Sequence, residues 1–119
     1  MWKPSRIALS LALVLCTATQ AKAQDFEEFL QGILTPEEIQ VHQQVGSKKA
    51  MQLARETCTA LNAGDSVTEF ATEVAQAIAS EGLPQEQLEV RALYSGKIIA
   101  VGVAMFCPEH LMQLQELQP

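Results

Sequence analysis

The side chains most capable of chemistry in this chain of 119 residues are two cysteines, Cys58 and Cys107. A cysteine pair can form a disulfide, bind a metal as thiolates, or supply a reactive thiol. The third cysteine, Cys16, lies in an N-terminal segment that has the pattern of a cleaved leader. Export would place the remaining pair in an oxidising compartment, so the sequence predicts one disulfide that clamps the fold.

A metal site is the alternative for the same cysteines. Cys107 and His110 have a C-x2-H spacing, and Cys58 and His42 would complete four ligands of types that zinc accepts. Structural zinc sites usually contain two close ligand pairs, and this chain has one. We therefore predict no metal or other cofactor. Outside a metal site, His42 and His110 are expected at the surface, with Glu38 one helical turn before His42.

Catalytic motifs are absent from the sequence. It has no serine–histidine–aspartate set in a recognisable context, no glycine-rich phosphate loop and no HExxH motif. The acidic pairs Glu27/Glu28 and Glu37/Glu38 fall near predicted helix starts, where negative charge is favourable. We expect no enzymatic activity.

Residues 1–23 have the three-part order of a secretory signal peptide: two basic residues, an apolar run over 7–18, then Ala21-Lys22-Ala23. This order predicts cleavage before Gln24 and export to the periplasm or the extracellular space. The apolar run is about 12 residues long and a membrane-spanning helix needs about 20, which disfavours a retained membrane span. Leu15 before Cys16 disfavours lipidation, because a lipoprotein site has a small residue there.

The mature chain would be small and acidic. Cleavage leaves 96 residues (119 − 23) and removes three of the eight basic residues, so five basic residues face 14 acidic ones, a net charge of −9. Nucleic acid and anionic membranes should repel such a chain. We expect one domain over 24–110, in which a disulfide supplements a small core.

Apolar spacing and capping residues predict an all-α fold, a small orthogonal bundle of four or five short helices with one disulfide. The first helix, 25–34, would bury one face. A capping box at Thr35 and Glu38 starts a helix that ends near Gly46, and the next helix ends near Gly64. Another runs from Ser66 to Ile78. The buried face of the first helix would consist of Phe26, Phe29, Leu30 and Ile33. The last helix would be the apolar run Ile98–Phe106, which Pro108 ends.

Two segments suggest binding. The tail over 111–119 spaces Leu111, Leu114 and Leu117 by threes, as in a short helix that docks into a partner's groove or packs on its own domain. The run Ile98–Phe106 would line a ligand pocket or form a plain core helix. We predict a non-enzymatic binding or interaction module whose partner is an unknown exported protein or a small ligand. The alternative is a regulator or inhibitor of another exported protein that acts through the tail.

Three strings resemble a known family: Asp25-Phe-Glu-Glu-Phe-Leu, then Cys58-Thr-Ala-Leu-Asn-Ala-Gly-Asp-Ser, then Ala104-Met-Phe-Cys-Pro. The chain is similar over roughly 25–110 to the small secreted proteins grouped as domain of unknown function 732. It departs from that pattern at Phe106, where tyrosine is common, and around 88–97. The resemblance implies a secreted helical domain with Cys58 bonded to Cys107, and it implies no activity.

Overall fold

The computed structural model describes residues 23–117, with side chains to Gln115, and every regular element in that range is helical. A helix over 23–33 precedes α2 (Pro36–Val45), α3 (Ser47–Asn62), α4 (Val67–Ala79), α5 (Gln85–Phe106) and the 3-10 helix η1 (Pro108–Leu117). The all-α prediction is confirmed. The predicted leader lies outside the described residues except for Ala23. None of the described helices is long and apolar enough to cross a membrane.

Local signals set the helix boundaries. Thr35 caps α2: its hydroxyl accepts from the Glu38 N–H at 3.2 Å, and the Glu38 carboxylate accepts from the Thr35 N–H at 2.9 Å. Gly46 separates α2 from α3 with a φ of 91°, and Gly64 follows α3 with a φ of 107°, a backbone conformation that side chains disfavour. The predicted capping box and both glycine breaks are therefore confirmed.

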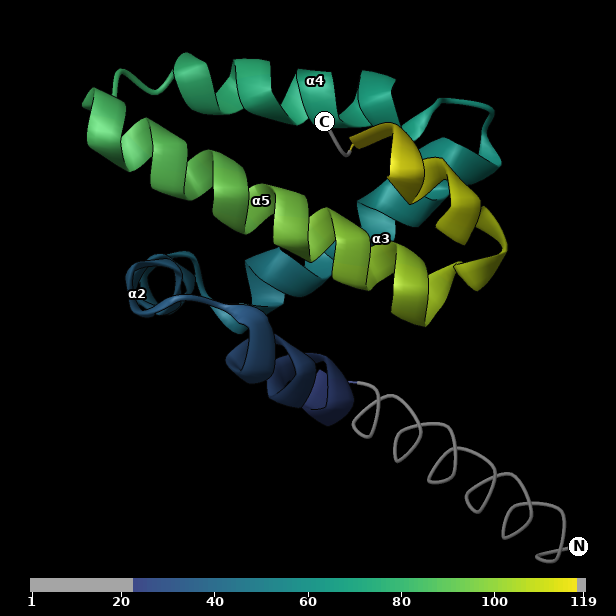
Figure 1. The fold of residues 1–119 in the computed structure, drawn as a ribbon, viewed down its shortest axis with the longest axis horizontal. Coiled ribbons are helices and arrows are strands. Elements are labelled where there is room, and N and C mark those ends of the chain that lie inside the picture. The colour runs from purple at the N-terminus through teal and green to yellow at the C-terminus, as the bar shows by residue number, and fades with distance from the viewer. Residues whose placement is uncertain (1–22, 118–119) are drawn as a thin grey trace, which may run out of the picture.

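The centre of the fold is the crossing of α3 and α5 (Figure 1). A Cβ added at Gly102 of α5 would lie 2.8 Å from both the Cα and the carbonyl oxygen of Ala54 in α3. Only glycine permits this approach of the two backbones. In Figure 1, α4 runs along one side of α5, while α2 and the first helix lie on the other.

Two apolar clusters lie along α5. The first joins the helix over 23–33 to α3 and α5 through Phe26, Leu30 and Ile98. The second surrounds the cysteines and includes Leu61, Val67, Ile99 and Val103. Because α5 contributes to both clusters, it positions every other helix of the domain.

Two details differ from the prediction. The first helix buries Phe26, Leu30 and Leu34, while Phe29 is 51% exposed and Ile33 is also exposed, so the predicted face was rotated by about one position. The last helix is longer than the apolar run, because α5 extends without interruption from Gln85 through Gly96 to Phe106.

Candidate functional site

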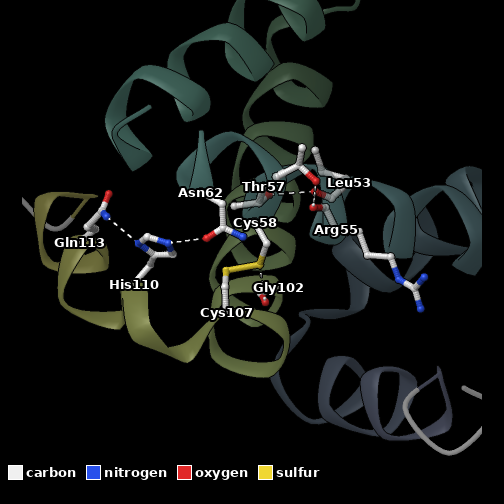
Figure 2. Close-up of a disulfide and its surroundings, with 10 residues drawn as sticks. Leu53, Arg55, Thr57, Cys58, Asn62, Gly102, Cys107, His110 and Gln113 are labelled. Carbon is white, nitrogen blue, oxygen red and sulfur yellow. Dashed lines mark hydrogen bonds between the residues drawn. A yellow bond between two sulfur atoms is a disulfide. The ribbon is translucent and has the colours of Figure 1, made fainter. Parts of the chain in front are cut away.

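Cys58 and Cys107 form a disulfide, with their Cα atoms 5.8 Å apart and both residues buried. Cys58 lies on α3 and Cys107 directly follows α5, so the bond fixes the two central helices near their crossing (Figure 2). The Cys58 sulfur lies 3.5 Å from the Gly102 carbonyl oxygen, and since a disulfide sulfur carries no proton this is a packing contact. Each sulfur is bonded to the other and is therefore not available as a thiolate ligand. The described residues contain no group of three or more side chains that could hold a metal ion.

His110 ties the start of η1 to the end of α3. Its Nε2 lies 2.8 Å from Asn62 Oδ1 and its Nδ1 lies 2.9 Å from Gln113 Nε2. Figure 2 shows Asn62, His110 and Gln113 in a row beside the disulfide. An imidazole that donates from Nε2 and accepts at Nδ1 satisfies both contacts. His110 is half-buried, so it lies at the surface as predicted but has two fixed partners that position the tail.

The three tail leucines have different surroundings. Leu114 is half-buried and packs against the disulfide cluster. Leu111 is exposed, as is its neighbour Met112, at 80%. The side chain of Leu117 lies outside the described residues. The structure thus places one leucine of the predicted partner-binding set against the domain and one at the surface.

His42 is buried at 5% exposure, so the prediction of a surface histidine is wrong. Its Nδ1 lies 2.6 Å from the Tyr94 hydroxyl of α5, and its Nε2 lies 3.0 Å from both carboxylate oxygens of Glu27. A ring with its proton on Nε2 donates to Glu27 and accepts from Tyr94, which satisfies all three groups. Three helices meet through this triad because Glu27, His42 and Tyr94 each come from a different one.

The triad keeps Tyr94 protonated. Burial, with the nearby negative charge of Glu27 adding to it, raises the pKa of Tyr94 to about 12, although Arg91 opposes the change. A phenol with so high a pKa is a stable hydrogen-bond donor and a poor nucleophile at neutral pH. Both nitrogens of His42 already have partners, so this arrangement suits a structural role.

A second polar tie joins Glu38 and Lys97. The Lys97 ammonium donates to the buried Glu38 carboxylate at 2.6 Å and to the Ile33 carbonyl at 2.9 Å. Burial alone would raise the pKa of Glu38, but the hydrogen bonds from Lys97 and Thr35 and the charge of Lys97 together lower it. One lysine of α5 thus closes the first helix and supports the cap of α2.

A hollow of about 270 Å³ lies where α2, α3, α4 and α5 meet, and we call it the crevice. Its lining includes Leu53, Val74, Ile78, Arg91, Tyr94 and Ser95. Its inner end is formed by buried residues such as Ile78, Tyr94 and Ser95, and its rim by the exposed Lys49, Ala77 and Glu81. A smaller hollow of about 60 Å³ shares Val74, Ile78 and Ser95 with it. The Ser95 side chain therefore faces a seam between α4 and α5.

Ser95 is the unusual residue of the crevice. The residue is 8% exposed, and its hydroxyl makes no hydrogen bond with any residue of the described range. No buried side-chain oxygen or nitrogen in that range lacks a partner, so the Ser95 hydroxyl is accessible to solvent from the crevice. The other hydroxyl on the lining, that of Tyr94, is already bonded to His42. A hydroxyl that opens into a narrow hollow and has no protein partner is free to bond to water or to a ligand.

A larger groove of about 590 Å³ lies between the first helix and α3. Its lining is mostly the exposed face of α3, with Lys48, Gln52 and Arg55, and it includes Ala23, which the predicted cleavage would remove. The crevice is the better candidate site because buried residues of the domain itself form its inner end.

Comparison with known proteins gives one match. The profile of a family described as "Protein of unknown function (DUF732)" matches residues 24–109. The chain belongs to the DUF732 family. No curated protein and no solved structure matches it significantly. The DUF732 match covers the disulfide, the triad and the crevice, and it confirms the resemblance found in the sequence.

Sequence reasoning found the cysteines of this DUF732 domain but missed the triad and the crevice. One signal for His42 was present: α2 has few apolar residues, so Glu38 and His42, one turn apart, had to supply part of its inner face. Nothing local marked Tyr94 as the partner, because 52 positions separate it from His42.

Proposed function

We propose that this DUF732 protein is an exported, non-enzymatic binding module that holds a small ligand in the crevice. One observation carries the proposal: the crevice has aliphatic walls and, at its inner end, an accessible serine hydroxyl that has no partner in the described range. A pocket with few polar groups among apolar walls is the usual form of a small-molecule site. Catalysis is not proposed, because His42, which bonds to the lining residue Tyr94, has both nitrogens engaged.

Export is part of the proposal. The pattern of residues 1–23 supports it, and the family match begins at Gln24, the residue predicted to start the mature chain. The disulfide is consistent with an oxidising compartment. N-terminal sequencing of the protein recovered from the exported fraction tests this part. A chain that begins at Met1 there would contradict cleavage, and a protein found only in the cytosol would contradict export.

The binding proposal is tested by protein-observed NMR of the mature chain with a set of small aliphatic and aromatic compounds. We expect shift changes around Val74, Ile78 and Ser95. Ala77 is on the rim, and Ala77→Trp should block those changes. Ala79→Trp is the matched control, because Ala79 is also exposed on α4 but does not line the crevice. Shift changes that cluster elsewhere, or that survive Ala77→Trp, would refute the crevice as the site.

The exposed tail supports a second candidate, a regulator that acts on another exported protein. Leu111 and Met112 are exposed on an element that His110 and Leu114 hold against the domain, so two apolar side chains are presented on a fixed support. Photo-crosslinking from position 112 in the exported fraction tests it, with the exposed position 115 as control. Equal crosslinking from both positions would remove this candidate.

A further inference from the structure

The charges at the crevice rim indicate what kind of ligand it takes, provided that the crevice binds small molecules as proposed above. The Arg91 guanidinium pairs with the Glu81 carboxylate at 3.1 Å, so these two charges largely balance. The Lys49 ammonium, also on the lining, makes no hydrogen bond or ion pair with a described residue. The charged residues on the lining itself therefore sum to one positive charge.

The polar and apolar groups of the crevice are separated along its depth. The aliphatic side chains of Val45, Leu53, Val74 and Ile78 form its walls, and Ser95 supplies a hydroxyl at the buried end. A ligand that uses all of these groups has an apolar body, with its charged end at the mouth beside Lys49. The Lys49 ammonium is a positively charged donor, so an anionic end matches it better than a neutral or a cationic one.

The volume of the crevice limits the size of the ligand. Each water-sized group occupies about 30 Å³ in a liquid, so a hollow of about 270 Å³ holds about nine such groups. We infer that the crevice binds a short-chain amphipathic carboxylate, with its aliphatic chain between α4 and α5 and its carboxylate at Lys49. The net charge of −9 of the predicted mature chain repels anions at long range. At physiological salt, however, charges more than about 8 Å away are largely screened, so the charge of Lys49 has the larger effect on an anion at the mouth.

The test compares three probes that each contain six carbon atoms and differ in charge: hexanoate, 1-hexanol and hexylammonium. Each is titrated into the oxidised mature protein, and binding is followed by amide shifts at Val74, Ile78 and Ser95. We expect hexanoate to bind about three- to tenfold more tightly than hexanol, as a partly exposed charge-assisted hydrogen bond would give, and hexylammonium to bind most weakly.

Two neighbouring lysines provide the matched variants. Lys49→Met removes the charge but keeps a long side chain, and it should reduce the affinity for hexanoate to that for hexanol. Lys48→Met removes the same charge from an exposed residue that does not line the crevice, and it should leave hexanoate binding within about twofold of wild type.

The outcomes separate this inference from the proposed function. Equal binding of hexanoate and hexanol, or no effect of Lys49→Met, would overturn the carboxylate class while the crevice remains a binding site. A loss of hexanoate binding in both lysine variants would show a general charge effect and would also overturn it. No shift changes at the crevice with any of the three probes would overturn both proposals.

Discussion

The close crossing of α3 and α5 makes one strong prediction, which concerns Gly102→Ala. The new methyl group would lie 2.8 Å from the Cα and carbonyl oxygen of Ala54 and 2.9 Å from its Cβ. Two of these three atoms are backbone, so no rotamer change relieves the clash and the helices must separate. Overpacking of this kind costs about 1–3 kcal/mol. Alanine is a better helix former than glycine by about 1 kcal/mol, which offsets part of that cost.

Gly96→Ala in the same helix isolates the packing term. A Cβ at Gly96 meets nothing within 4 Å, so this variant should gain the helix propensity alone. Both substitutions change propensity equally, and the difference between them is therefore the overpacking cost of about 1–3 kcal/mol. In a domain of this size, 1 kcal/mol corresponds to about 4–8 °C in melting temperature.

Thermal unfolding of both oxidised variants, followed by far-ultraviolet circular dichroism, measures the difference. Gly96→Ala should melt above wild type, and Gly102→Ala at least about 4 °C below Gly96→Ala. If the two variants melted together, the helices would be farther apart at Ala54 than the structure places them, and the reasoning would be refuted.

Three more predictions concern the ties between helices. Reduction of the disulfide, which spans 49 positions, should lower the free energy of unfolding by about 4 kcal/mol in urea titrations; an unchanged midpoint would make the bond incidental. Tyr94 is the only tyrosine, so near-ultraviolet absorbance reports its ionisation directly. Since its pKa rises from 10.0 to about 12 on folding, the free energy of unfolding should fall between those pH values by at most about 3 kcal/mol. A titration midpoint near 10 in the folded chain would contradict the burial argument. The pKa of Glu38 is lowered on folding from its ordinary value of 4.5, so its stabilising effect is complete above pH 4.5 and is lost as pH falls through the folded value. Glu38→Gln should flatten this acid transition. An unaltered dependence of the free energy of unfolding on pH would count against the Lys97 pair.

Helix positions in this protein were predictable because their signals are local. Thr35 and Glu38 are three residues apart, and Gly46, Gly64 and Pro108 each interrupt a helix through their own backbone preference. The inner face of a helix is not a local property. Phe29 and Leu34 both fit an apolar stripe, and the helices packed against them determine that Leu34 is buried and Phe29 is exposed.

The candidate site was less predictable for the same reason. His42 pairs with Tyr94 across 52 positions and Glu38 with Lys97 across 59, so no spacing in the sequence relates them. The crevice arises only when four helices have packed, because α2, α3, α4 and α5 all contribute to its lining. The disulfide was predictable without a structure because, once Cys16 is assigned to the predicted leader, Cys58 and Cys107 leave one intramolecular pairing.

The three ties of α5 respond to different conditions, and together they determine where the fold is stable. Lys97 holds Glu38 while that carboxylate is ionised, Tyr94 holds His42 while its phenol is protonated, and Cys107 holds Cys58 while the pair is oxidised. The first tie weakens in acid and the second above about pH 10, as their pKa changes require. The third tie responds to a reductant. The disulfide tie therefore needs oxidising conditions, which is consistent with the export proposed above.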